Sequence, residues 1–114
     1  YRGMTLNQAE LENIISNGIE PSKGLWRRAV SSSDDVSIAM FFAHAYVGQD
    51  RGLSDSRVFI FLMRRDDTEW KIHTAPSGSH YFSRQDKVPL EDLIGYHVYS
   101  PNESGEFPFE YYEL

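Results

Sequence analysis

The stretch Val30–Ala43 reads Val-Ser-Ser-Ser-Asp-Asp-Val-Ser-Ile-Ala-Met-Phe-Phe-Ala. It predicts the end of a strand, three hydroxyls, and then an amphipathic helix from about Asp34 to Val47. Ser33 is the expected N-cap, because a serine hydroxyl accepts hydrogen bonds from unpaired N–H groups of the first helical turn. The negative charges of Asp34 and Asp35 suit the positive end of the helix dipole. Apolar residues then recur at helical spacing: Val36, Ala39, Met40 and Ala43.

Length and composition indicate one globular domain over residues 1–114. A chain of 114 residues can bury one hydrophobic core but not two. Apolar residues make up 40% and charged residues 25%, as in an ordinary globular protein. The net charge of −6 disfavours a nucleic-acid backbone or an anionic membrane as the main partner. No apolar run approaches membrane-spanning length.

The sequence offers little for metal or thiol chemistry. It contains no cysteine, which excludes disulfides and cysteine-ligated zinc. The histidines have no short metal-ligand spacing, and we expect structural roles for them. They are His44, His73, His80 and His97. No metal is expected.

A second helix and a strong strand are predicted on either side of this stretch. Thr5 and Gln8 fit a capping box that opens a helix over about Leu6–Asn17. Gly18 can end that helix in the left-handed conformation. The run Arg57–Met63 is continuously apolar and rich in β-formers. It therefore predicts a strand at the centre of a sheet, buried on both faces.

The second half of the chain predicts further strands. Trp70–Ala75 alternates and is expected to pair as a hairpin partner. Residues 80–87 look irregular and polar, whereas Tyr96–Tyr99 alternates as a strand. A last edge strand is predicted over Phe107–Tyr112, because Pro108 is tolerated only at an edge. The order of elements indicates an α+β domain with a mainly antiparallel sheet.

Three segments, in this order, resemble the ADP-ribosyltransferase fold, on the branch of cholera-toxin-like mono-ADP-ribosyltransferases. Tyr1-Arg2-Gly3 is similar to that family's opening strand with its NAD-binding arginine. Val30–Ser33 is similar to its Ser-Thr-Ser strand, and Val88–Tyr96 to its Ile-Pro…Gly-Tyr entry to a closing strand. The resemblance implies a split pair of small sheets with two flanking helices and NAD, the substrate, in the cleft between the sheets.

The resemblance also implies roles for individual residues. Arg2 would hold the NAD diphosphate or the nearby ribose, which guanidinium groups suit. Ser31 would orient the ribose and a catalytic carboxylate. Tyr81, or in its place Phe82, would stack on nicotinamide or on the target. The reaction passes through a sugar cation that a carboxylate stabilises electrostatically.

The family's Glu-x-Glu or Gln-x-Glu motif is not evident. Counting back without a gap from Val88 reaches Ser79-His80-Tyr81, which has no carboxylate. Asp86 is the nearest acid and serves if the intervening loop is shortened; some enzymes of this fold that modify rifamycins use an aspartate. For Glu91, a role as a polar residue in the turn before a strand is favoured.

Two functional hypotheses follow. The first is a mono-ADP-ribosyltransferase toxin or effector, secreted and acting on a host or target protein of another cell. The second is a catalytically degenerate domain of the same fold that binds a protein partner, which the acidic charge and abundant Tyr and Phe suit. An unrelated α+β interaction domain is the third. Arg27-Arg28 is an additional candidate contact for a phosphorylated ligand.

Overall fold

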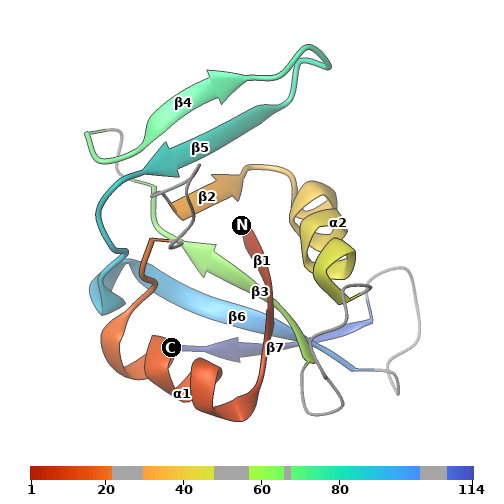
Figure 1. Cartoon of the computed structure of the whole chain (residues 1–114), viewed down its shortest axis with the longest axis vertical. Helices are drawn as coiled ribbons and strands as arrows, with labels where there is room; N and C mark the ends of the chain where they lie inside the picture. Colours follow the sequence, from red (N-terminus) through yellow and green to blue (C-terminus); the bar gives the residue numbers. More distant parts are fainter. Residues whose placement is uncertain (22–29, 48–56, 66–67, 101–107) are drawn as a thin grey trace.

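The computed structural model describes residues 1–21, 30–47, 57–65, 68–100 and 108–114. These residues form two α-helices and two antiparallel sheets (Figure 1). In chain order the elements are β1 (Arg2–Leu6), α1 (Gln8–Asn17), β2 (Val30–Ser33), α2 (Val36–Val47), β3 (Arg57–Met63), β4 (Lys71–Thr74), β5 (His80–Arg84), the 3₁₀ turn η1 (Leu90–Asp92), β6 (Leu93–Tyr99) and β7 (Phe109–Glu113). The α+β class is therefore confirmed in its broad form.

Backbone hydrogen bonds between Tyr1 and Ser33 join the two sheets. The first has the strand order β1-β3-β6-β7 and the second β2-β5-β4. The main-chain nitrogen of Tyr1 donates to Ser33 O at 2.8 Å, and Ser33 N–H donates to Tyr1 O at 2.9 Å. This pair of bonds links the start of β1 to the end of β2, and Figure 1 shows the smaller sheet beyond that junction.

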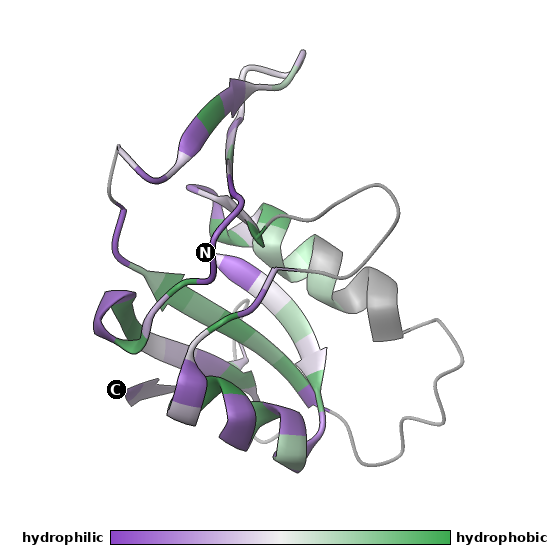
Figure 2. Ribbon diagram, turned by 60° about the vertical axis from the view of Figure 1, so that its left-hand side comes forward, coloured by the Kyte–Doolittle hydropathy of each residue, from purple (hydrophilic) through white to green (hydrophobic). Residues whose placement is uncertain are grey.

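Strand β3 lies between β1 and β6, and its four residues Val58–Phe61 are all buried. Phe59 and Phe61 belong to the larger core cluster, which also contains residues of α1 and of the second sheet. The side chains of Val58 and Ile60 pack on the other face, in a cluster with residues of α2. In Figure 2, β3 is hydrophobic along most of its length, whereas hydrophobic and hydrophilic residues alternate along α1. The predicted central strand is confirmed.

Helix α2 approaches β1 very closely because β1 carries a glycine. A Cβ built on Gly3 would lie 1.9 Å from the carbonyl oxygen of Ala39. Two residues further along β1, the Thr5 hydroxyl donates to Ala43 O at 3.0 Å. Thr5 therefore anchors α2 and does not cap α1, so the predicted role of Thr5 is wrong.

The N-cap of α1 is Asn7. Its side-chain oxygen accepts from Glu10 N–H at 2.8 Å, while the Glu10 carboxylate accepts from Asn7 N–H at 3.1 Å. This is a capping box two residues later than predicted, because the strand β1 extends to Leu6. Gly18 ends α1 with φ = 90°, as predicted.

Helix α2 also begins later than predicted, at Val36. The Asp35 carboxylate accepts from Ser37 N–H at 2.9 Å and from the Ser37 hydroxyl at 2.6 Å. These bonds hold the pKa of Asp35 below its usual value. Ser33 belongs to β2 instead, and its hydroxyl accepts from Asp35 N–H at 3.0 Å. The predicted helix cap at Ser33 is wrong.

One prediction about the later strands is also wrong. Residues 80–84, expected to be irregular, form β5, which is the hairpin partner of β4. In β5 the buried residues are Phe82 and Arg84. Because one of these two inward positions is a charged arginine, the segment does not show the alternation of apolar and polar residues that is typical of a strand. The predicted edge strand is confirmed as β7, which pairs only with β6 among the described strands.

Candidate functional site

Arg2 and Ser31 lie together where the two sheets join. The guanidinium Nη1 of Arg2 donates to Ser31 O at 2.8 Å and to Ser31 Oγ at 3.1 Å. Arg2 opens β1, at the edge of the four-stranded sheet, and Ser31 lies in β2 of the other sheet. Two residues that are 29 positions apart in the chain thus form one polar contact between the sheets.

The strand register places Tyr81 on the same face as Ser31. Ser31 is the Cα partner of Ser83, and Ser33 is the partner of Tyr81. Directly paired residues of antiparallel strands share a face, and so do residues two apart along a strand. We call this face the Ser31 face; besides Ser31 and Ser33 it carries Lys71, His73, Tyr81 and Ser83.

Two close contacts order the Ser31 face. The rings of His73 and Tyr81 stack with centroids 4.7 Å apart and planes at 10°. His73 Nε2 lies 2.9 Å from Ser83 Oγ, within hydrogen-bond distance. The side chains of Ser31, Lys71 and Tyr81 are exposed. The face thus offers hydroxyls, an imidazole, an ammonium and a phenol ring to solvent.

Asp86 is not part of this ordered face. It lies three residues after Ser83, in the bend that follows β5, and its side chain is exposed. Its backbone carbonyl accepts from Arg84 Nε at 3.1 Å. Among the described residues of β2, β4 and β5, the Ser31 face carries no carboxylate. The sheet therefore does not determine where the Asp86 carboxylate lies relative to Ser31.

The other predicted positions are placed as follows. Glu91 is exposed in η1, directly before β6, as favoured from the sequence. Arg27 and Arg28 lie outside the described residues. No group of three or more potential metal ligands occurs in the part of the chain that the structure describes.

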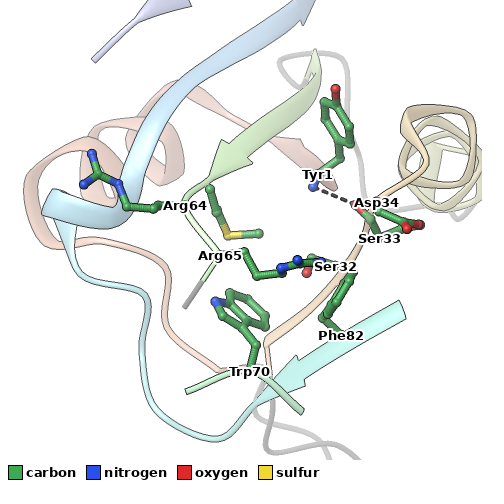
Figure 3. Close-up of a pocket in the computed structure, with 9 residues that line it drawn as sticks. Tyr1, Ser32, Ser33, Asp34, Arg64, Arg65, Trp70 and Phe82 are labelled. Atoms are coloured by element: carbon green, nitrogen blue, oxygen red, sulfur yellow. Dashed lines mark hydrogen bonds between the residues drawn. The ribbon is translucent and has the colours of Figure 1, made fainter. Parts of the chain in front are cut away.

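The opposite side of the three-stranded sheet borders a pocket of about 270 Å³ (Figure 3). Alternation places Ser32 and Phe82 on this side, away from Ser31 and Tyr81. The lining comes from both sheets and from the segments next to them: Tyr1, Ser32, Ser33, Asp34, Met63, Arg64, Arg65, Trp70 and Phe82. The pocket therefore lies between the two sheets, but neither Arg2 nor Ser31 lines it.

Charged and aromatic residues both line this pocket. The Arg65 guanidinium carbon lies 5.4 Å from the centroid of the Phe82 ring, and Figure 3 shows its side chain extending toward Ser32. Asp34 Oδ2 lies 3.7 Å from Nδ1 of His80. Among the described residues, the buried indole N–H of Trp70 has no hydrogen-bond partner. Such a lining suits a planar ligand that carries hydrogen-bond acceptors.

Sequence reasoning missed Arg65 and Trp70. Both lie outside the strands, after β3 and before β4; Arg65 belongs to a charged run that reads as a surface turn, and Trp70 falls in a segment predicted as a strand. The residue type of Trp70 was the available signal, because tryptophan is highly buried on average, and Trp70 is indeed buried. Phe82 was an alternative to Tyr81 for ring stacking, and the structure places the two on opposite sides of the sheet.

Comparisons with protein-family models, with curated proteins and with solved structures returned no significant match to this chain. None of the helices over the described residues is long and apolar enough to cross a membrane.

Proposed function

We propose that this protein is a mono-ADP-ribosyltransferase domain with an NAD-binding cleft at the junction of its two sheets. The observation that carries the proposal is the contact of Arg2 with Ser31. These are two of the residues to which the family resemblance assigns NAD binding, and they come from separate parts of the chain. Two small sheets, joined at Tyr1 and Ser33, support an ADP-ribosyltransferase fold.

The chemistry of the Ser31 face suits NAD. Arg2 supplies a positive charge for the diphosphate or for a ribose oxygen. Ser31 Oγ accepts from Arg2, which leaves its own proton to donate to a ribose oxygen. The ring of Tyr81 is 45% exposed and provides a surface on which nicotinamide can stack.

Catalysis also needs a group that stabilises the ribosyl cation formed as nicotinamide departs. We assign this role to Asp86, the acid nearest in the chain to the end of β5. The acceptor in this proposal is a protein of another cell, to which the domain is delivered as a secreted toxin or effector. This part of the proposal rests on the family resemblance.

The test compares two arginines. Calorimetry with NAD is run on the wild type, on Arg2→Ala and on Arg64→Ala; Arg64 is one of the residues that line the pocket on the other side of the sheet. Losing a charge-assisted contact of about 1.5–3 kcal/mol predicts at least tenfold weaker binding for Arg2→Ala. Arg64→Ala should change the affinity less than twofold. Absent NAD binding in the wild type, or the reverse order of the variants, overturns the proposal.

A second candidate function is favoured by one observation. The β5 residues that face β2 on the Ser31 face are Tyr81 and Ser83, neither of which is acidic. This fits a degenerate domain that binds a protein partner without transferring ADP-ribose. Release of nicotinamide from NAD, measured with and without a target-cell lysate, separates the two. Release that is lost in Asp86→Asn supports the enzyme, and NAD binding without release supports the degenerate domain.

A further inference from the structure

We propose that Ser83 is itself an acceptor of ADP-ribose and that His73 acts as its general base. The inference rests on the proposed function, because it requires NAD on the Ser31 face. It adds to that function a specific acceptor atom, Ser83 Oγ, within the same chain.

His73 and Ser83 have the geometry of a base and a nucleophile. Their Nε2 and Oγ atoms lie 2.9 Å apart. With its proton on Nδ1, the imidazole accepts the Ser83 O–H and can remove that proton.

The imidazole is held in this position by its neighbours. His73 is the Cα partner of Tyr81, and their rings stack at 4.7 Å with nearly parallel planes. Stacking of this kind restricts rotation of the imidazole about its side-chain bonds. The hydrogen bond to Ser83 is therefore part of an ordered arrangement across β4 and β5.

Ser83 also lies beside the residues proposed to hold NAD. It is the direct Cα partner of Ser31, whose hydroxyl and carbonyl accept from Arg2. Neighbouring strands are separated by about 4.8 Å. A ribose oriented by Ser31 is thus one strand away from Ser83 Oγ, on the same face of the sheet.

Other serines in the described residues lack this combination. Ser33 is buried, and its hydroxyl donates to a carbonyl, that of His80. Ser32 lies on the pocket side of the sheet. Ser37 donates to the Asp35 carboxylate, but the lowered pKa of Asp35 makes that carboxylate a weak base. Ser37 is therefore a suitable control.

The step balances without a further reactant. A bond forms between Ser83 Oγ and C1 of the nicotinamide ribose, while the bond from C1 to the nicotinamide nitrogen breaks. The electron pair of the broken bond stays with nicotinamide, which leaves as a neutral molecule. The Ser83 proton passes to His73 Nε2 and from there to water, and nothing is oxidised or reduced.

The experiment is incubation of the purified chain with NAD, followed by digestion and mass spectrometry. We expect ADP-ribose on Ser83 in the wild type and in Ser37→Ala, and none on this peptide in Ser83→Ala. His73→Gln should slow modification at least tenfold, since a general base contributes about 10²–10⁴-fold.

NAD binding is measured by calorimetry on every variant. This measurement separates a loss of NAD binding from a loss of Ser83 modification. If the wild type binds NAD but Ser83 stays unmodified, the inference is overturned while NAD binding stands. If the wild type does not bind NAD, both proposals are overturned. Modification of another residue, or a Ser83 rate that His73→Gln leaves unchanged, overturns the assigned roles. Ser83→Thr, which keeps a hydroxyl, should retain part of the modification if Ser83→Ala folds poorly.

Discussion

The two sheets differ in how many of their faces are buried. In the four-stranded sheet, β3 is buried on both faces, by the larger core cluster on one side and by α2 on the other. In the three-stranded sheet, Val30 and Phe82 enter the core, whereas Ser31 and Tyr81 on the opposite face are exposed. Stability should therefore depend mainly on the first sheet, and the polar face of the second is available for binding.

Gly3→Val should have the largest effect. A Cβ at this position would lie 1.9 Å from a backbone atom of α2, so the helix must move away from β1. We expect a loss above about 3 kcal/mol, at the upper end for overpacking, and a melting temperature lower by more than roughly 10 °C. Thermal unfolding, monitored by circular dichroism, measures the melting temperature.

Gly78→Ala is the control for Gly3→Val. Gly78 has a positive φ of 87°, but a Cβ there would meet no atom within 4 Å. Only backbone strain of about 1 kcal/mol is then expected. Equal losses in the two variants would contradict the close approach of α2 to β1.

Phe61→Ala should cost about 3–5 kcal/mol, because Phe61 is fully buried in the central strand. Ile72→Ala in β4 should cost less than about 1 kcal/mol, since that side chain is 51% exposed. Urea unfolding of both variants tests the contrast between the sheets. A loss for Ile72→Ala as large as that for Phe61→Ala would show that the second sheet carries equal stability.

Ser31→Ala and Ser32→Ala compare the two faces of the second sheet. Ser31→Ala removes a hydrogen-bond acceptor of Arg2, so NAD binding should weaken about 3–10-fold. Ser32→Ala changes the pocket side and should leave NAD affinity unchanged. Calorimetry with NAD measures both affinities. A larger loss of affinity for Ser32→Ala would contradict the proposed site on the Ser31 face and would indicate that NAD binds in the pocket.

The smallest effect concerns His97 in β6. Burial lowers the pKa of His97, so below about pH 6.5 the unfolded chain binds this proton more readily than the folded chain. Stability from His97 is therefore present above that pH and is lost as the pH falls toward the lowered pKa. His97→Gln should lose less stability than the wild type between pH 7 and pH 5. The pKa of Asp35 is also lowered, but the stability that this carboxylate contributes is lost only as the pH falls toward and below about 3.8, outside the range of pH 7 to pH 5.

The local elements were predictable where one physical signal dominates. Continuous apolar β-formers predict the buried strand β3, and Gly18 predicts the end of α1. The caps were misplaced because Thr5 and Ser33 had a second available partner, Ala43 O for Thr5 and Asp35 N–H for Ser33. Strand β5 was missed because its inward residue Arg84 is charged; its guanidinium donates to Lys87 O at 2.9 Å.

The sequence by itself determined that the chain has an apolar central strand, helices on either side of Val30–Ser33, and an arginine and serines of the types that bind NAD. Only the tertiary structure decided that Arg2 reaches Ser31, that Tyr81 and Ser83 share the Ser31 face, and that Phe82 turns toward a pocket with Arg65 and Trp70. The physical reason is register. In a sheet, a shift of one residue moves every side chain to the opposite face, and register is set by contacts between distant strands.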